Sequence, residues 1–328
     1  MDRRAPPARP ARLLARQMLA LALLAVPAGR TAAQAPTGSL TVFNAGSLAA
    51  PFRELLQAFV RRTPGVVPRQ ENAGSLETAR KLTELGRIPD VVGVADYLVI
   101  PNLLVPGQAT WYVSFARNSM VLVHSDRSIG AREISSANWW QILLRPGVRT
   151  GRSDPSLDPN GYRALMVTQL AERHYGQPGL AGRLVAAMPP RYVRPKEADL
   201  IALVQAGELD YAWSYRSIAR TVGLPYVSLP PEVDLSDPDR AAWYALARVR
   251  VPGGTRAGAD SITIGGEPIV YALTIPTRAP NPVAAEAFVR VVFSPDGQGI
   301  LARHGFQLLD HPVAGGPGHP PAGILPAP

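Results

Sequence analysis

The spacing of apolar residues changes repeatedly along this chain, and each change separates a predicted strand from a predicted helix. Residues 40–44 form a short extended run, whereas residues 48–63 repeat apolar side chains at the spacing of a helix face. The same pattern predicts further strands at 66–71, 90–95, 119–124, 209–214 and 268–275, and helices at 76–85, 160–174, 199–205 and 282–293. Strands that alternate with helices are typical of an α/β fold with mostly parallel sheets.

Several polar residues follow the predicted strands or begin the predicted helices. In α/β sheets, ligands bind at the carboxyl ends of strands, where loops lead into helix N-termini. Ser47, Asp96 and Tyr215 come after predicted strands, and Ser75 and Asn160 begin predicted helices. These five residues are therefore placed where an α/β protein holds its ligand.

The tetrapeptide Ala-Gly-Ser-Leu occurs twice, at 45–48 and 73–76. Each copy ends an extended run and precedes a helical stretch. A Gly-Ser turn at a helix start offers backbone N–H groups and a hydroxyl, which together suit a small oxyanion. The alternative is that Ser47 and Ser75 cap their helices, a role that Ser favours and that is compatible with ligand binding.

The first 35 residues are typical of a secretory signal peptide. Five arginines precede the apolar run 18–26, and small residues follow it up to Ala35. The apolar run is shorter than the about 20 residues that a membrane-spanning helix needs. We expect residues 1–35 to be removed, with cleavage after Ala33 or Ala35, and the protein to be free in the periplasm.

Charge and cysteine content narrow the classes of partner. The chain carries a net charge of +9, but six arginines and one aspartate lie in the first 33 residues, so about +4 remains after cleavage. This charge and the absence of a basic block with interleaved aromatics argue against nucleic-acid binding. The chain has no cysteine, which excludes disulfides, thiolate metal sites and a lipid-modified N-terminal cysteine.

The remaining length of about 295 residues fits two domains. Residues 313–328 consist mainly of Pro, Gly and Ala with almost no core-forming pattern, so the sequence predicts a disordered tail there.

Three motifs carry a resemblance to a known family. They are ADY at 95–97, DPNGYR at 158–163 and PKEADL at 195–200. With the two AGS turns, they resemble the tungstate/molybdate-binding proteins of ABC importers, and the similarity covers nearly all of the chain after the signal peptide. The resemblance implies a type II periplasmic binding protein, in which a ligand cleft lies between two α/β lobes joined by two crossover strands.

The resemblance also implies the lobe boundaries and the binding residues. Lobe one would comprise 36–117 plus 267–312 and lobe two 118–266, with hinge strands near 119–124 and 269–275. The implied ligand-binding residues are Gly46, Ser47, Ser75, Asp158, Pro159, Asn160, Glu197 and Tyr215. Many members of the family have Cys where this chain has Asn160, a change that a backbone N–H contact would survive.

Two of the implied residues are carboxylates, which is unusual for an anion site. An ionised carboxylate beside a dianion costs several kcal/mol at protein-like dielectric constants. A tungsten or molybdenum centre can expand from four oxygens to six, so Asp158 and Glu197 would bind the metal atom of the oxyanion directly. Sulfur cannot expand in this way, which would select against sulfate.

No cofactor is expected besides this ligand. The partners would be the oxyanion and a membrane permease of an ABC importer, and the protein would be a monomer.

Each site residue has a purely structural alternative. Asp158 can be a turn or cap residue, Glu197 a surface acid favoured by the helix dipole, and Tyr215 a packing residue. Asp96 and Tyr97 are expected to serve structure at the cleft rim. The indoles of Trp139, Trp140 and Trp213 are expected in lobe cores or on helix faces.

Two other classes of function are alternatives to tungstate or molybdate binding. A serine hydrolase is disfavoured because the segment around Ser47 is not Gly-x-Ser-x-Gly, and no His pair has metal-ligand spacing, so we expect no enzyme. The alternative function is binding of another small anion, such as sulfate, phosphate or an organic anion.

Overall fold

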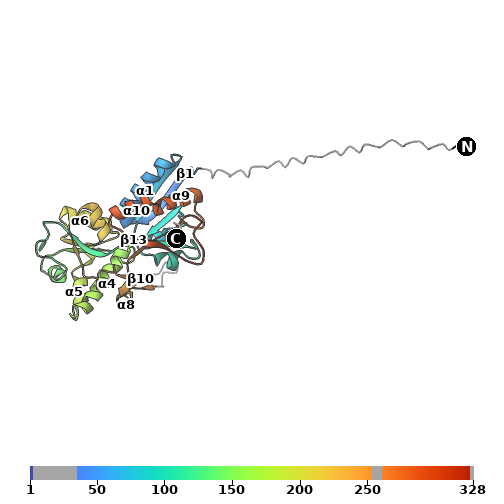
Figure 1. The fold of residues 1–328 in the computed structure, drawn as a ribbon. Coiled ribbons are helices and arrows are strands. Elements are labelled where there is room, and N and C mark those ends of the chain that lie inside the picture. Colours follow the sequence, from blue (N-terminus) through green and yellow to red (C-terminus); the bar gives the residue numbers. More distant parts are fainter. Residues whose placement is uncertain (3–34, 253–260, 326–328) are drawn as a thin grey trace. The chain divides into compact units, whose positions relative to one another are not determined.

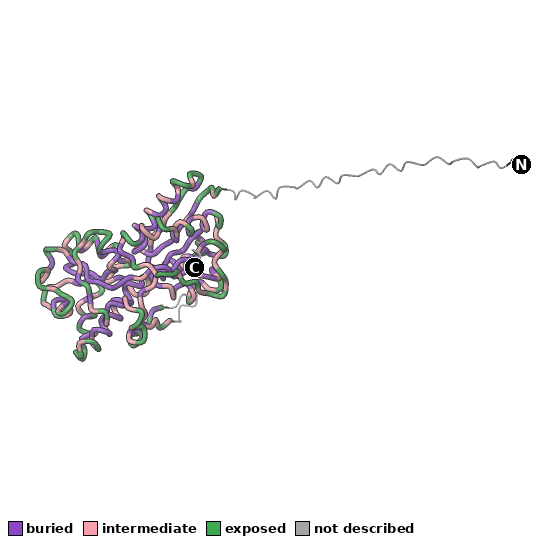
Figure 2. The backbone as a smooth tube through the Cα atoms, in the orientation of Figure 1, coloured by how far each residue is buried: buried purple, intermediate pink, exposed green. Residues whose placement is uncertain are grey.

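The computed structural model describes residues 1–2, 35–252 and 261–325. The predicted signal peptide lies almost wholly outside these ranges. The chain from Ala35 onward forms one compact unit that contains two large sheets. Figure 2 shows the buried segments running through the interior of this unit, with the exposed segments around them.

The first large sheet has six strands in the order β13-β4-β12-β3-β1-β2. They are β1 (Gly38–Ala45), β2 (Val66–Ala73), β3 (Val91–Val94), β4 (Tyr112–Arg117), β12 (Val270–Thr274) and β13 (Gln307–Gly315). Its helices are α1 (Ala49–Arg62), α2 (Ser75–Thr83), α9 (Pro282–Phe293) and α10 (Pro295–Arg303), with the short helices η1 (Gly46–Leu48) and η2 (Ile100–Leu104). We call this sheet with its helices the first lobe.

The second large sheet has five strands in the order β7-β6-β8-β5-β9. They are β5 (Met120–His124), β6 (Thr150–Ser153), β7 (Val193–Arg194), β8 (Tyr211–Tyr215) and β9 (Tyr226–Ser228). The associated helices are α3 (Trp139–Leu143), α4 (Pro159–His174), α5 (Leu180–Ala186), α6 (Glu197–Ala206), α7 (Arg216–Val222) and α8 (Ala241–Tyr244), with η3 (Pro190–Tyr192) and η4 (Pro238–Arg240). With the hairpin of β10 (Arg248–Pro252) and β11 (Ser261–Gly265), these elements form the second lobe.

Both large sheets are mixed, so the prediction of mostly parallel sheets is wrong. β1 pairs in parallel with β2 and β3, whereas β12 is antiparallel to β3 and β4, and β13 is antiparallel to β4. In the second sheet β6 is parallel to β7 and β8, but β5 is antiparallel to β8 and β9. All elements of the second lobe lie between β4 and β12 in the sequence. These two neighbouring strands are therefore not joined by the single helical crossover that is usual between parallel strands.

The first-lobe core illustrates how the apolar pattern becomes packing. Phe52 and Phe59 lie on one face of α1, and each ring packs edge-on against Phe288 of α9, with centroids 6.0 and 5.8 Å apart. Helix α9 begins at Pro282, and the Asn281 side chain accepts a hydrogen bond from the N–H of Ala284, an N-cap that fixes this start. Figure 1 shows α1, α9 and α10 grouped beside β1.

The prediction of a disordered tail from Val313 onward is wrong for the part of it that the structure describes. Val313, Ala314 and Gly315 pair with β4 as the end of an edge strand. Gly318 donates its N–H to the carbonyl of Thr110, and Ile324 is buried. The backbone hydrogen bonds of an edge strand hold this segment, although its composition offers few core residues.

The tryptophan prediction is confirmed. Trp139 and Trp213 are fully buried and pack edge-on at 5.6 Å, and Trp140 packs partly buried against the same core. The predicted lobe boundaries and hinge strands remain predictions. Among the helices that the structure describes, none has the length and apolar character needed to cross a membrane.

Candidate functional site

Asp158 caps the N-terminus of α4 and Glu197 begins α6, both in the second lobe, and their carboxyl groups belong to one hydrogen-bond network. Asp158 caps α4: its Oδ1 accepts from the N–H of Asn160 at 3.2 Å, and its Oδ2 accepts from the N–H of Glu197 at 3.1 Å. Oε1 of Glu197 accepts from the N–H of Tyr215 at 2.7 Å and from the Ser214 hydroxyl at 2.5 Å. The two residues are 7% and 2% exposed, so both carboxyl groups are held rigidly away from bulk water.

Burial changes the protonation of this pair. Burial raises the pKa of Asp158 to about 6. Burial, followed by the negative charge of Asp158, raises the pKa of Glu197 to about 8. At neutral pH Glu197 therefore keeps its proton while Asp158 is mostly ionised. A positive centre that contacts both groups would remove the penalty for ionising them together.

Ser75 is the first residue of α2 and is fully buried. Its Oγ accepts a hydrogen bond from the backbone N–H of Ala95, which follows β3, at 3.0 Å. A backbone N–H can only donate, so the Ser75 oxygen acts as acceptor in this bond. The hydroxyl proton of Ser75 is therefore available to a second acceptor.

The hydroxyl oxygen of Ser47 in η1 also accepts a hydrogen bond, here from the Tyr271 hydroxyl, which Asn118 orients in turn. Nδ2 of Asn118 donates to the Tyr271 hydroxyl at 3.2 Å, and that hydroxyl donates to Oγ of Ser47 at 2.8 Å. Oδ1 of Asn118 accepts the N–H groups of Ser119 and Ser217, which fixes the direction of its amide. The Ser47 proton is consequently also left to donate.

Tyr215 ends β8, and its hydroxyl accepts from Nη1 of Arg163 at 2.9 Å. A guanidinium has no acceptor, so the phenol proton of Tyr215 is not used in this bond. The rings of Tyr215 and Tyr271 pack edge-on at 6.1 Å, which brings Tyr215 beside the residue that orients Ser47. Three buried hydroxyls, from η1, α2 and β8, are thus set to donate.

The second AGS turn packs directly against the loop that precedes α4. The N–H of Glu77 donates to the Leu157 carbonyl at 3.2 Å, and Arg80 donates to the Ser156 carbonyl at 2.8 Å. A Cβ at Gly74 would overlap this same Leu157 carbonyl, so a residue without a side chain is required there. Ser75 and Asp158 are therefore brought to facing sides of one seam between the lobes.

Several structural alternatives from the sequence are settled by these contacts. The cap residues of η1 and α2 are Ala45 and Gly74, so neither Ser47 nor Ser75 caps a helix with its side chain. Glu197 is not a surface acid, because it is almost fully buried. Asp158 does cap its helix, as one alternative expected.

Three further predicted residues have roles within the protein. The Asn160 side chain donates to the Trp213 carbonyl at 3.2 Å and accepts from Ser153 at 3.1 Å, so it ties α4 to the second sheet. Pro159 occupies the first turn of α4, where its missing N–H costs nothing. Gly46 begins η1. Ligand contacts of these three residues remain predictions.

Sequence reasoning missed the residues that orient the hydroxyls. These are Arg163, Tyr271 and Asn118, together with Ser214, which bonds Glu197. Arg163 belongs to the DPNGYR motif that also contains Asp158, so its place in this motif could have indicated a role near the site. Tyr271 and Asn118 carry no comparable signal, because their partners lie far away in the sequence.

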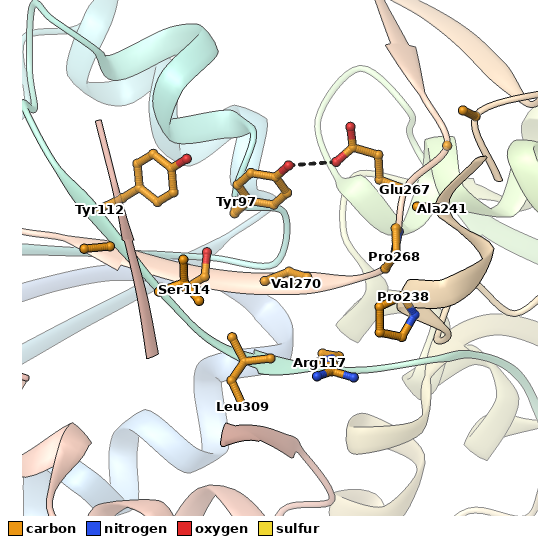
Figure 3. A pocket seen from close by; sticks show the side chains of 14 residues that line it. Tyr97, Tyr112, Ser114, Arg117, Pro238, Ala241, Glu267, Pro268, Val270 and Leu309 are labelled. Atoms are coloured by element: carbon orange, nitrogen blue, oxygen red, sulfur yellow. Dashed lines mark hydrogen bonds between the residues drawn. The ribbon is translucent and has the colours of Figure 1, made fainter. Parts of the chain in front are cut away.

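A separate cavity of about 570 Å³ lies on the other face of β12 (Figure 3). Val270 lines this cavity, whereas the next residue, Tyr271, contacts Ser47, as alternation along a strand requires. The cavity wall includes Tyr97, whose hydroxyl donates to Glu267 at 2.9 Å, but no residue of the predicted ligand set.

Comparisons with known proteins identify the family and the fold. Residues 40–307 match the family described as bacterial extracellular solute-binding protein. A solute-binding protein of Petrotoga mobilis is 46% identical over 84% of this chain and 85% of its own length. The molybdate/tungstate-binding protein WtpA of Pyrococcus abyssi is 35% identical over 88% of this chain and 90% of its own length. The periplasmic molybdate-binding protein of Azotobacter vinelandii has a similar fold, with a TM-score of 0.60, 17% identity and coverage of 83% of this chain and all of that one.

Proposed function

The chain belongs to the bacterial extracellular solute-binding proteins, and from this premise we propose that it captures tungstate or molybdate and delivers the anion to an ABC importer. It acts outside the cytoplasmic membrane, as a monomer and without a cofactor, and it catalyses no reaction. The named relative from Pyrococcus abyssi supports the choice of ligand.

The buried pair of Asp158 and Glu197 supports this function most directly. A site for sulfate or phosphate gains nothing from a buried, ionised carboxylate such as that of Asp158, because its negative charge repels the anion. A tungsten or molybdenum centre accepts one oxygen from each carboxyl group and completes a six-oxygen shell. The metal then supplies the positive charge that a buried carboxylate needs.

The three hydroxyl donors serve the oxide oxygens of the same anion. Ser47, Ser75 and Tyr215 each present a proton, and an oxyanion presents only acceptors. Neutral donors in a buried site bind an anion strongly because the local dielectric constant is low. Ser47 and Ser75 come from the first lobe and Tyr215 from the second, so the anion is held from both sides.

Isothermal titration calorimetry with tungstate, molybdate, sulfate and phosphate tests this function. We expect binding of tungstate and molybdate only, and at least about a hundredfold weaker binding, or roughly 2.7 kcal/mol, in Glu197→Gln and Asp158→Asn. The matched control is Asp199→Asn, because Asp199 shares the first turn of α6 and has no place in the network. Wild-type tungstate affinity in both carboxyl variants would show that the metal is not coordinated by this pair.

The donors alone would suit any small oxyanion, which keeps sulfate, phosphate or an organic anion as the alternative ligand. The same titrations decide between the two. A wild-type protein that binds sulfate or phosphate, and neither tungstate nor molybdate, would replace the proposed ligand by this alternative.

A further inference from the structure

Two sequence motifs contain buried residues that are not among the predicted ligand contacts. Asp96 follows β3 of the first lobe, and Tyr162 and Arg163 lie near the start of α4 in the second lobe. Their exposed fractions are 6%, 1% and 3%. Buried polar side chains are costly unless they bond one another, so their mutual contacts need an explanation.

The three side chains meet across the seam between the lobes. Tyr162 donates its phenol proton to Oδ2 of Asp96, and Nη2 of Arg163 lies 3.4 Å from the same oxygen. Oδ1 of Asp96 accepts the N–H of Leu98 at 3.0 Å, which orients the carboxylate from within its own lobe. Burial, followed by the charge of Asp96, raises the pKa of Tyr162 well above its usual value, so the phenol stays a donor.

The same guanidinium also contacts one residue beside the anion site in each lobe. Nη1 of Arg163 donates to the Ala95 carbonyl at 2.7 Å and to the Tyr215 hydroxyl at 2.9 Å. Ala95 in turn donates its N–H to Ser75. One side chain thus connects a site hydroxyl of the second lobe with the residue that orients a site hydroxyl of the first.

We propose that Asp96, Tyr162 and Arg163 form an interlobe latch that holds the lobes closed over the anion site and slows release of the bound anion. The latch rests on the proposed function, because it takes Ser75 and Tyr215 as groups that bind the anion.

The physical case is that these contacts exist only when the lobes meet. A buried ion pair is favourable only if both charges and their hydrogen bonds are satisfied together, and separated lobes would return each group to water. The latch therefore stabilises the closed arrangement over the open one and shifts the population between them. The anion enters the open arrangement and the lobes then close over it, so loss of the latch bonds falls on the dissociation rate more than on the association rate.

The variant Tyr162→Phe tests the latch, because it keeps the buried ring and removes one hydroxyl. We expect tungstate to dissociate about tenfold faster in stopped-flow measurements, with an association rate within about twofold of wild type. The matched control is Tyr244→Phe, since Tyr244 is also fully buried but bonds only nearby residues of its own segment, Pro231 and Asp237.

A second readout does not need the ligand. The chain has no cysteine, so spin labels at Gln57→Cys on α1 and Arg183→Cys on α5 report the lobe separation alone. We expect Tyr162→Phe to increase the population at long distances in the ligand-free protein, and Tyr244→Phe to leave it unchanged.

Asp96→Asn provides a second variant that keeps an acceptor for Leu98 and removes the charge, and it decides the question if Tyr162→Phe does not fold. Unchanged dissociation rates together with unchanged distance distributions would overturn the latch. If the wild-type protein binds neither tungstate nor molybdate, the proposed function fails, and the distance distributions still decide the latch.

Discussion

The backbone N–H of Glu197 donates to Oδ2 of Asp158 at 3.1 Å, so the start of one helix holds the cap residue of another. This bond fixes two carboxyl groups from α4 and α6 beside each other in a buried site. The arrangement stores an electrostatic cost in the ligand-free protein, and it makes both stability and binding depend on pH.

The ligand-free protein is expected to lose stability as the pH rises from about 4.5 to 8. Glu197 has a folded pKa of about 8 against a usual value of 4.5, so in this window the folded state binds more protons than the unfolded state. Stability then falls with rising pH, at a rate of at most about 1.4 kcal/mol per pH unit for one group. Thermal unfolding between pH 4.5 and 9 measures this slope, which should be smaller in Glu197→Gln. A Glu208→Gln control, at an exposed residue, should keep the wild-type slope.

Binding of tungstate should release protons near neutral pH. Glu197 holds a proton below a pKa of about 8 and must lose it to coordinate the metal. The apparent affinity should rise between pH 6.5 and 8, by at most about tenfold per unit for one proton. Calorimetry in buffers of different ionisation enthalpy counts the released protons. Equal heats in all buffers at pH 7 would contradict a coordinating role for Glu197.

Gly74→Ala should prevent closure while leaving each lobe folded. Its Cβ would overlap the Leu157 carbonyl across the seam, and separating the lobes relieves this overlap. We expect tungstate affinity to fall by at least about tenfold, or 1.4 kcal/mol, with little change in the ligand-free melting temperature. Gly182→Ala on α5 is the control, because a Cβ there meets nothing within 4 Å. A large loss of ligand-free stability in Gly74→Ala would indicate that the contact supports the fold itself.

Ser75→Ala should weaken both stability and binding. It removes one donor to the anion and leaves the buried N–H of Ala95 without its acceptor. An unsatisfied buried donor costs about 1–3 kcal/mol, which chemical denaturation of the ligand-free protein measures. Ser39→Ala at an exposed position of β1 should change neither quantity. If Ser75→Ala keeps wild-type tungstate affinity, Ser75 is not an anion donor.

The sequence predicted the elements whose apolar spacing is regular. The helix expected at 282–293 has those same bounds as α9, and β1, α1, α2 and α4 match their predictions within a few residues. Strand β13 was missed because it is an edge strand with many exposed residues and a proline, Pro312, so its hydrogen bonds rather than its side chains hold it. The antiparallel pairing of β12 was missed because strand order is not visible in local spacing.

For the site, the types of residue were predictable but their orientation was not. The AGS turns and the DPNGYR motif led to Ser47, Ser75 and Asp158. Which hydroxyl donates depends on partners such as Tyr271, which lies 224 residues from Ser47 along the chain. Glu197 was left open as a surface acid, because its burial arises from packing against β8 and not from its own helix.

The order of strands in the first sheet also has a consequence for biosynthesis. β12 lies between β3 and β4, so a nascent chain that ends before Val270 cannot join these two strands. The middle of the first sheet must wait until most of the polypeptide has been made. A chain that stays incompletely folded for so long exposes apolar surface and unpaired strand edges, and these remain open to aggregation until the last strands are synthesised.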